Sequence, residues 1–334
     1  MSSNRRSMRL MPRIGIAVIV AIGMMVPLAA SAHVTTRDGN NAGIPNFQHV
    51  FVIMMENTSY TSLIGNTTYA PFINSAAATY GLATNYFGVT HPSQPNYIAA
   101  TSGSTNGVVN DNDVTIKVPN IVNQLESHGK TWKAYMQSYS LCTTPLDHAC
   151  GNQLYERKHN PFISYTDVQK NPVRVAKIVD FSQFSTDLAN NTVPNYSWIS
   201  PDQCHDMHGR SDPGDACDFS NVQGLIATGD AFLQSTVNQI MSSKVWQNGN
   251  STIFIAWDES DFPFSDTSGC CDAVPGGGHV VTLVISNSVN SPVTSGVAYN
   301  HYSMLSTIEG AWNLGCLKFT CDTTNVKPMS DLVN

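Results

Sequence analysis

Charged residues are scarce in this sequence, and basic residues are scarcer than acidic ones. Only 12% of its 334 residues are charged, and 17 Lys and Arg stand against 24 Asp and Glu, giving a net charge of −7. This balance argues against binding to nucleic acid or to an anionic membrane through bulk electrostatics, so an anionic substrate needs a local binding device. Hydrophobic residues make up 42%, which allows a large packed core and argues against disorder.

Several familiar signatures are also missing. No G-x-S-x-G elbow surrounds Ser93, so a serine hydrolase triad is not indicated. No G-x-x-x-x-G-K-[ST] loop occurs, so cradling of a nucleoside triphosphate is not indicated either. The sequence shows no internal repeat, coiled coil or low-complexity tract, and after the N-terminus it has no apolar run long enough to cross a bilayer.

The first 32 residues are predicted to be a signal peptide. Four arginines give a positive start, an apolar run follows at residues 14–28, and Ala30-Ser31-Ala32 offers a cleavage site. An uncleaved anchor is the alternative, but the run is short for a membrane span. Residues 33–46 are expected to form a flexible leader and 47–334 a single domain. Cleavage leaves 13 basic against 24 acidic residues, a net charge of −11, on a secreted or periplasmic protein without a transmembrane segment.

All eight cysteines follow the predicted signal peptide, and disulfides are the default for an exported protein. A cysteine zinc site is the weaker interpretation, because no pairs with two-residue spacing recur. The spacing favours three local disulfides and leaves Cys270 and Cys271 bonded to each other or to other partners. The expected local pairs are Cys142 with Cys150, Cys204 with Cys217 and Cys316 with Cys321.

Continuous apolar runs alternate with helical patterns along the chain. Such runs suit strands that are buried on both faces, and their alternation with helices predicts a three-layer α/β/α sandwich around a mostly parallel sheet. The stretches 140–180 and 260–278 are expected to be long loops, each with a cysteine pair. Strands are predicted at 50–55, 195–200, 251–257 and 279–286, and helices at 118–129, 225–243 and 301–315.

Polar clusters follow three of these strands directly. In open α/β sheets ligands bind beyond the carboxyl ends of the strands, so the clusters are expected to share one edge. Packed acidic groups repel one another unless a cation or protons neutralise them, and the chain has few basic residues. A divalent metal is therefore predicted, with Ca²⁺, Mg²⁺ or Mn²⁺ favoured by oxygen ligands and Zn²⁺ an alternative because of the histidines. The clusters are Glu56-Asn57, the segment 202–208, and Asp258-Glu259 with Asp261.

The segment "SPDQCHDMHG" places His205, Asp206 and His208 within four residues. We interpret them as metal or phosphate ligands or as a general acid, against the alternative of a surface loop with chance histidines. His159, His279 and His301 are weaker candidates, for each of which a purely structural role is the alternative.

Ser93 lies at a predicted strand-to-helix junction. A β-compatible segment precedes it, Pro95 fits the first helical turn, and Gly103 can close the helix. Free N–H groups at a helix start favour an anion, and a bound metal can activate a serine hydroxyl. Taken alone, Ser93 reads better as a helix cap. Beside the carboxylate clusters, it becomes a candidate nucleophile for phosphoryl transfer.

At this point the sequence resembles the phosphoesterase family, which includes secreted bacterial acid phosphatases and non-specific phospholipases C of the alkaline phosphatase superfamily. The resemblance covers roughly residues 47–315 and depends on the joint order of several motifs. They are "MMENTSYTSLIG", "THPSQPNYIAATSGSTNGV", "KHNPF", "SPDQCHDMH", "AWDESD", "GGGHVVTLVIS" and "HYSMLSTIE".

The resemblance implies an alkaline-phosphatase-like α/β/α fold and assigns roles to particular residues. It places the nucleophile of the S-x-P-N motif on Ser93. It places the two metal-binding pairs on Glu56 with Asn57 and on Asp258 with Glu259.

Further roles concern the phosphate and the leaving group. Asp206 and His208 match the family's "DMH" segment and are expected to face the phosphate, as is Asn110 of "GVVN". His208 or His159 is the expected acid for the leaving group. His205, His279 and His301 are counted with Asn110 as candidate substrate-binding residues.

The predicted function is a secreted, metal-dependent acid phosphatase that hydrolyses phosphate monoesters through a phosphoserine. The compact chain and "GVTHPSQPNY" resemble the secreted acid phosphatases, some of which act on phosphoinositides such as phosphatidylinositol 3-phosphate. The nearest alternative is a phospholipase C that cleaves phospholipid diesters. An alternative of another class is a non-catalytic exported metal-binding protein.

Overall fold

The apolar runs form a central sheet. The computed structural model describes Met1 and residues 43–261 and 264–334, so the predicted signal peptide and most of the leader lie outside the described residues. Nine strands form one sheet in the order β10-β2-β9-β8-β1-β7-β3-β6, with β11 beside β2. The sheet strands are β1 (His49–Met55), β2 (Gly81–Phe87), β3 (Trp132–Met136), β6 (Ile178–Asp180), β7 (Tyr196–Ser200), β8 (Ser251–Trp257), β9 (His279–Ser286), β10 (Val293–Ser295) and β11 (Tyr299–Asn300).

The sheet is mostly parallel, as predicted. Only β9 runs against its neighbours β2 and β8, while the other described pairings are parallel. β1 lies between β7 and β8, with Val50 opposite both Tyr196 and Thr252. Every residue of β7 and β8 is buried, which is the expected state of central strands covered on both faces.

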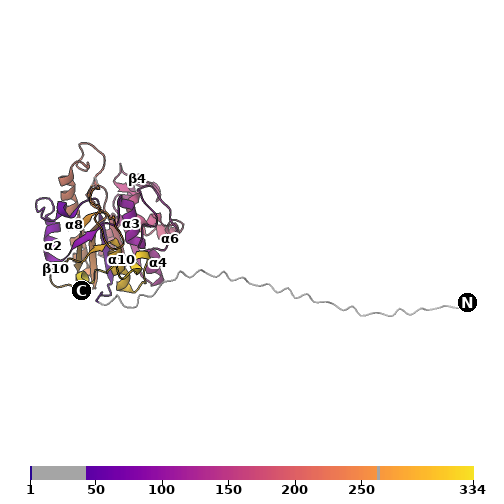
Figure 1. Ribbon diagram of the computed structural model, residues 1–334. Coiled ribbons are helices and arrows are strands. Elements are labelled where there is room, and N and C mark those ends of the chain that lie inside the picture. The colour runs from indigo at the N-terminus through magenta and orange to yellow at the C-terminus, as the bar shows by residue number, and fades with distance from the viewer. Residues whose placement is uncertain (2–42, 262–263) are drawn as a thin grey trace. The chain divides into compact units, whose positions relative to one another are not determined.

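Helices cover both faces of this sheet, which completes the predicted α/β/α sandwich (Figure 1). One layer holds α2 (Pro71–Thr79), α7 (Ser182–Asn190), α8 (Val222–Ser242) and α9 (Lys244–Gln247). The other holds α3 (Ser93–Ser102), α4 (Ile121–Ser127) and α10 (His301–Trp312), and α4 and α10 are joined by a hydrogen bond between Gln124 and Glu309. The remaining short helices are α1 (Tyr60–Leu63), α5 (Thr166–Gln169), α6 (Pro172–Val175) and α11 (Ser330–Val333).

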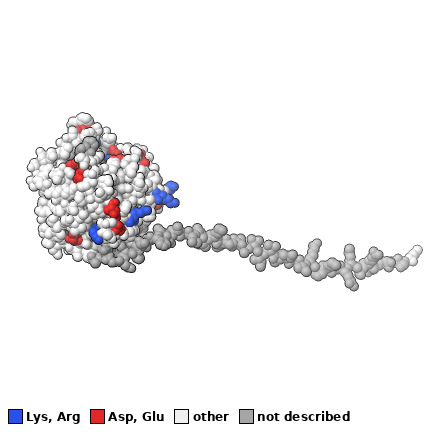
Figure 2. Space-filling view, viewed as in Figure 1, with Lys and Arg blue, Asp and Glu red and all other residues white. Residues whose placement is uncertain are grey.

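The residues from 43 onward share one principal hydrophobic core, to which strands and both helical layers contribute. The residues of β1 from Val50 to Met55 are fully buried, and each large apolar side chain of this kind contributes roughly 1.5–3 kcal/mol of transfer free energy. The surface is sparsely charged: on the face in Figure 2, acidic and basic side chains are scattered rather than gathered in a basic stripe. No helix within the described residues is both long and apolar enough to cross a membrane.

All eight cysteines form disulfides, and the three expected local pairs are present. Cys270 and Cys271, whose partners the sequence left open, are bonded to each other. The bonds pin loops, because Cys142–Cys150 lies in the stretch after β3 and Cys204–Cys217 closes the loop between β7 and α8.

The prediction of a long loop at 140–180 is wrong in detail. The stretch contains α5, α6, β6 and the hairpin of β4 (Ala149–Cys150) with β5 (Tyr155–Glu156). It also includes most of η1 (Tyr139–Leu141) and all of η2 (Arg157–His159) and η3 (Pro161–Ser164), while η4 (Lys318–Cys321) follows α10. None of these pieces exceeds four residues, so they are too short to leave a periodic apolar pattern in the sequence. In 260–278, the described residues form no helix or strand.

Candidate active site

Three neighbouring parallel strands bring the polar clusters to one edge of the sheet. β8, β1 and β7 are adjacent, and their last residues are followed by Asp258, Glu56 and Pro201, with Asp202 next. The pairing of Met55 with Trp257 sets Glu56 and Asp258 side by side. The amide of Asn57 donates a hydrogen bond to Asp258 Oδ1 at 3.0 Å, which ties the two strand ends together.

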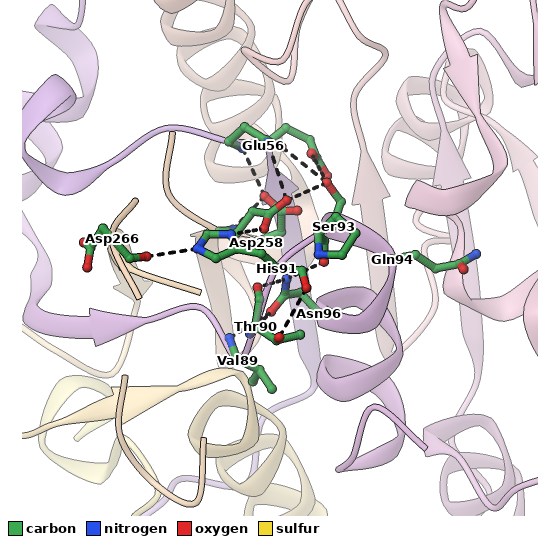
Figure 3. Close-up of polar contacts among 12 residues, drawn as sticks. Glu56, Val89, Thr90, His91, Ser93, Gln94, Asn96, Asp258 and Asp266 are labelled. Atoms are coloured by element: carbon green, nitrogen blue, oxygen red, sulfur yellow. Dashed lines mark hydrogen bonds and ion pairs between the residues drawn. The ribbon is translucent and has the colours of Figure 1, made fainter. Parts of the chain in front are cut away.

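Ser93 lies against these carboxylates. It is the first residue of α3, one position further into the helix than expected, and its side chain is buried. Its hydroxyl oxygen lies 3.0 Å from Glu56 Oε2, 3.0 Å from Glu259 Oε1 and 3.3 Å from Asn57 Oδ1 (Figure 3). Pro92 is the cap residue, and its side chain makes no cap hydrogen bond. Ser93 is therefore not a helix cap; its single proton faces three acceptor oxygens.

The start of α3 is already occupied by a carboxylate. Asp111 Oδ1 accepts a hydrogen bond from the Gln94 amide at 2.9 Å, and Asp111 Oδ2 lies 3.1 Å from Lys158 Nζ. Pro95 has no N–H to offer. The anion that the sequence predicts at this helix start is thus, in this structure, a side chain of the protein itself.

The site carboxylates are crowded and buried. Burial, and then the charge of Asp258, holds the pKa of Glu56 well above its usual value. Burial, and then the charge of Glu259, does the same to the pKa of Asp258, and burial raises the pKa of Glu259. Each of these groups is costly to ionise here without a positive partner.

This donor set fits a divalent cation. No hydrogen bond from a described residue reaches Glu56 Oε1 or Asp258 Oδ2, although both are buried. Together with Asn57 and Glu259, these residues offer the oxygen ligands that hard divalent cations prefer. Glu56, Asn57 and Glu259 are arranged around Ser93 Oγ, and Asp258 is joined to them by the hydrogen bond that its Oδ1 accepts from the Asn57 amide. Within residues 43–261 and 264–334, the only close cluster of three ligand atoms is Cys142, Asp147 and Cys150, whose cysteines are disulfide bonded.

His159 and Asp206 flank Glu56. His159 Nε2 lies 3.1 Å from Glu56 Oε1, and its Nδ1 lies 3.5 Å from Asp206 Oδ2. The His159 ring stacks on Tyr97, with ring centroids 5.3 Å apart. Burial, and then the charges of Lys158 and His208, holds the pKa of His159 well below its usual value, while burial and the charge of Glu56 raise the pKa of Asp206. A neutral His159 lies against Glu56 without a hydrogen bond between Nε2 and Oε1, and it is a poor proton donor.

His208 is placed differently from His159. Its amide donates to Asp206 Oδ1 at 2.8 Å, and its Nδ1 lies 2.7 Å from the carbonyl oxygen of Gly209. Since a carbonyl only accepts, Nδ1 carries a proton, and Nε2 is the nitrogen that can gain or lose one. Burial, and then the charge of Lys158, lowers the pKa of His208 to about 4. His208 also lines a cavity next to the site, which makes it the better placed of the two candidate acids.

The four candidate substrate-binding residues lie outside this network. His301 is fully buried with both ring nitrogens engaged, by Tyr86 Oη at 3.0 Å and by the backbone oxygen of Asp258 at 2.7 Å. It supports the end of β8. Asn110 is exposed, and its Oδ1 accepts a hydrogen bond from the Asn112 amide at 3.1 Å.

The other two histidines are engaged by their own surroundings. His205 Nδ1 lies 2.6 Å from Asp202 Oδ1, and its ring packs near Phe232. His279 stacks on Tyr60 at 4.4 Å, with Nε2 2.9 Å from the Thr84 oxygen. Neither makes a described contact with Ser93 or with the carboxylates around it.

Two residues near the site were not singled out from the sequence. His91 Nδ1 contacts Glu259 Oε2, and its Nε2 lies 2.9 Å from the Asp266 carbonyl (Figure 3). Burial opposes protonation of His91, but the hydrogen bonds to Glu259 and Asp266 and the charges of these two residues together outweigh it and raise the pKa. Lys158 is largely buried beside Asp111, and the charges of Glu56 and Asp111 outweigh burial and raise its pKa. His91 and Lys158 both belong to motifs quoted in the sequence analysis. For Lys158, a further signal was its positive charge within an acidic chain that has few lysines.

Residues 66–315 match the family described as the Phosphoesterase family. This chain belongs to the phosphoesterase family. The match covers most of the chain and confirms the family indicated by the order of the sequence motifs.

Curated relatives of this phosphoesterase are phosphatases. It is 29% identical over 295 residues to a phosphatidylinositol-3-phosphatase of Mycobacterium tuberculosis, covering 87% of this chain and 84% of the relative. It is 27% identical to a probable acid phosphatase of Kluyveromyces lactis and 26% identical to an acid phosphatase of Aspergillus fumigatus, covering 80% and 81% of this chain. It spans only 59% and 56% of those two fungal proteins. The relatives and the family together confirm the predicted enzyme class, a phosphoric monoester hydrolase.

Solved structures confirm the predicted fold. A protein of the alkaline phosphatase superfamily from Vibrio parahaemolyticus aligns with a TM-score of 0.55 at 12% identity, over 83% of this chain and 69% of that one. The lipoteichoic acid synthase LtaP of Listeria monocytogenes aligns with a TM-score of 0.53 at 11% identity, over 86% and 78%. At such low identity the likeness concerns the fold alone.

Proposed function

We propose that this phosphoesterase is an exported, metal-dependent acid phosphatase that uses Ser93 as its nucleophile. The observation that carries the proposal is the buried Ser93 hydroxyl, which faces Glu56, Asn57 and Glu259 at the edge where three strands end. A helix-capping or packing role does not require a serine proton to face three acceptors in a buried, acidic pocket. Phosphoryl transfer, in contrast, needs an activated hydroxyl beside a charge-neutralising site.

Glu56, Asn57, Asp258 and Glu259 would hold the cation. When bound, a divalent cation lowers the pKa of a nearby hydroxyl and neutralises charge on a phosphate. Ca²⁺, Mg²⁺ or Mn²⁺ suits the four oxygen donors better than Zn²⁺, which is more often held by nitrogen and sulfur ligands.

The protein's own groups can carry the proton transfers. Ser93 Oγ attacks phosphorus in line and gives its proton to Glu56 or Glu259, each 3.0 Å away. As the new Oγ–P bond forms, the bond from phosphorus to the leaving oxygen breaks, and His208 delivers a proton to that oxygen. Water then attacks the phosphoserine and gives a proton to His208, which restores the acid. The Oγ–P bond breaks, the carboxyl that took the Ser93 proton returns it to Oγ, and phosphate leaves. Lys158 supplies positive charge beside this site throughout.

Substrate and location extend the same proposal. The substrates are phosphate monoesters, and the named activity of the mycobacterial relative adds phosphoinositides such as phosphatidylinositol 3-phosphate to those worth testing. Export to an oxidising compartment, secreted or periplasmic, agrees with four disulfides among the described residues. The N-terminal arginines and apolar run would supply the signal.

The direct test is substitution of the nucleophile. Ser93→Ala should reduce kcat on an aryl phosphate by about 10³-fold or more and remove a phosphoenzyme trapped by acid quenching. Ser102→Ala, in the same buried helix, is the matched control and should keep both signals, because the Ser102 hydroxyl binds only backbone oxygens and Asn106. Retained phosphoenzyme in Ser93→Ala would exclude this role.

A substrate panel separates the alternatives. The unchanged protein should hydrolyse a soluble monoester and leave phosphatidylcholine intact, whereas a phospholipase C would do the reverse. A purely metal-binding protein would gain thermal stability from the cation and turn over neither substrate.

A further inference from the structure

A cavity of about 480 Å³ opens beside the phosphate site, and no step proposed above uses its apolar lining. Its size lies within the usual range for small-molecule pockets. Asn57 and His208 line one part of it, so the cavity is continuous with the site around Ser93, whose Oγ lies 3.3 Å from Asn57 Oδ1. When the substrate phosphate lies at Ser93 and the leaving alcohol lies near His208, the organic part of that alcohol can occupy this cavity.

The rest of the lining is largely apolar. Val222, Leu225 and Ile226 lie at positions i, i+3 and i+4 of α8 and form one face of its first turns. Phe219, just before α8, adds an aromatic side chain at the rim. Phe219 and Val222 are each 54% exposed, although most other large apolar side chains among the described residues are buried. Apolar side chains left exposed around a cavity are typical of ligand-binding sites.

Met207 lies between the site around Ser93 and the apolar part of the cavity. It lies between Asp206 and His208 with φ at +83°, a backbone conformation that residues other than glycine rarely adopt. Its side chain is buried against Gly229 of α8, where an added Cβ would come within 2.6 Å of it. The segment therefore sends His208 and Met207 to the same cavity, one as a proton donor and the other as apolar lining.

We infer that this cavity binds the organic part of the substrate, so that the enzyme prefers phosphate monoesters whose leaving alcohol is apolar, alkyl or aryl. The inference rests on the proposed function and names the substrate class for the same site. The phosphate lies at Ser93 and the leaving oxygen lies toward His208. The carbon chain packs on the apolar lining, which includes Met207, Leu225 and Ile226 and, at the rim, Phe219 and Val222. A polyol leaving group, such as the inositol ring of a phosphoinositide, would lose hydration against this lining, whose polar members besides Asn57 and His208 are Thr58 and Asp261. Phosphoinositides should therefore be poorer substrates than alkyl or aryl phosphates.

A series of straight-chain alkyl phosphates tests the inference, because ethyl, butyl and hexyl alcohols have nearly the same pKa and differ mainly in apolar surface. For the unchanged protein, kcat/KM should rise about three- to fourfold for each added CH₂ until the cavity is filled. Methyl phosphate serves as the reference substrate that barely enters the cavity.

The rim variants locate the effect. The double variant Phe219→Ser with Val222→Thr should flatten the chain-length dependence and leave methyl phosphate turnover unchanged. Val173→Thr is the matched control, since Val173 is exposed near the start of α6 and does not line the cavity; it should keep the full dependence. Both exchanged rim residues are half-exposed, so folding should be preserved.

The outcomes separate the two proposals. Turnover of methyl phosphate with no gain along the series would overturn the apolar subsite and leave the phosphatase intact. A gain that the double variant does not diminish would place the carbon chain elsewhere and also overturn the inference. Absence of turnover on every monoester would overturn the proposed function and the subsite with it.

Discussion

Replacing His208 with glutamine should make the enzyme selectively poor at esters with a difficult leaving group. His208 Nδ1 is committed to the Gly209 carbonyl, so the proton that matters is the one on Nε2, at the cavity wall. Glutamine keeps a polar side chain of similar reach but has no proton to deliver. An alkyl phosphate needs that proton because an alkoxide leaves poorly, whereas p-nitrophenyl phosphate releases a stable anion.

The size of the effect follows from the pKa of His208, which burial and the charge of Lys158 lower to about 4. General acid catalysis contributes about 10²–10⁴-fold. With a pKa near 4, about one His208 in ten is protonated at pH 5 and about one in a thousand at pH 7. At pH 5, His208→Gln should therefore cost alkyl phosphate hydrolysis about 10–10³-fold in kcat/KM, and p-nitrophenyl phosphate much less. The advantage that His208 confers falls as pH rises, because the acid form is lost.

The assay is the ratio of kcat/KM for butyl phosphate to that for p-nitrophenyl phosphate between pH 3.5 and 7. Ionisation of the phosphate itself largely cancels in this ratio. In the unchanged protein the ratio should fall about tenfold per unit above pH 4, and in His208→Gln it should be low and flat. His128→Gln, an exposed histidine remote from the site, should behave like the unchanged protein. A ratio that keeps its slope in His208→Gln would refute His208 as the acid.

Three further predictions concern the cation, a surface ion cluster and a turn. Adding Mn²⁺ or Mg²⁺ after exhaustive chelation should raise the Tm more at pH 7 than at pH 5. The reason is that the cation displaces protons from Glu56, Asp258 and Glu259, whose pKa values burial raises. An equal rise in Tm at the two pH values would contradict these three residues as ligands. Burial disfavours ionised Glu126, but hydrogen bonds from Lys177, Trp132 and Arg174 lower its pKa to about 2. Glu126→Gln should therefore lower the free energy of unfolding in urea at pH 7 by about 1 kcal/mol, a value discounted because the side chain is partly exposed. The difference between variant and unchanged protein should vanish as pH falls from 4.5 to 2. Gly103→Ala should lower the free energy of unfolding by more than about 2 kcal/mol, because φ is +73° and the new Cβ would lie 2.0 Å from the Leu317 carbonyl oxygen. Gly107 has a similar φ of +81° but open space around the added Cβ, so Gly107→Ala should lower it by only about 1 kcal/mol.

The central fold was predictable because its strands are buried on both faces. Runs such as 251–257 and 279–286 have few polar interruptions, and the structure begins and ends both strands at the predicted residues. The sheet's edges were not predictable. β6 and β10 have three residues each and depend on pairing with β3 and β2. Such short strands leave no pattern in the local sequence from which they could be predicted.

The histidines near the site also show which features the sequence pattern predicts and which depend on the path of the loops. His159 reaches Glu56 through the compact turns η2 and η3, and His205 turns to Asp202 although it stands only three residues from His208. Their directions depend on loop paths fixed by bonds such as Cys204–Cys217 and by packing on α8. Residue type and spacing identify such histidines as candidates but do not determine which of them lies near Ser93.

The position of the carboxylates could be predicted because strand register determines where they lie. Met55 pairs with Trp257, so the next residues, Glu56 and Asp258, must emerge side by side from the sheet edge whatever the loops do. His208 and the apolar cavity lie instead on the segment between β7 and α8, which is held by a disulfide and by side-chain packing. Changes in that segment should therefore alter leaving-group preference while the proposed ligands around Ser93 stay in place. This division explains why the sequence indicates phosphoryl chemistry more clearly than it indicates the substrate.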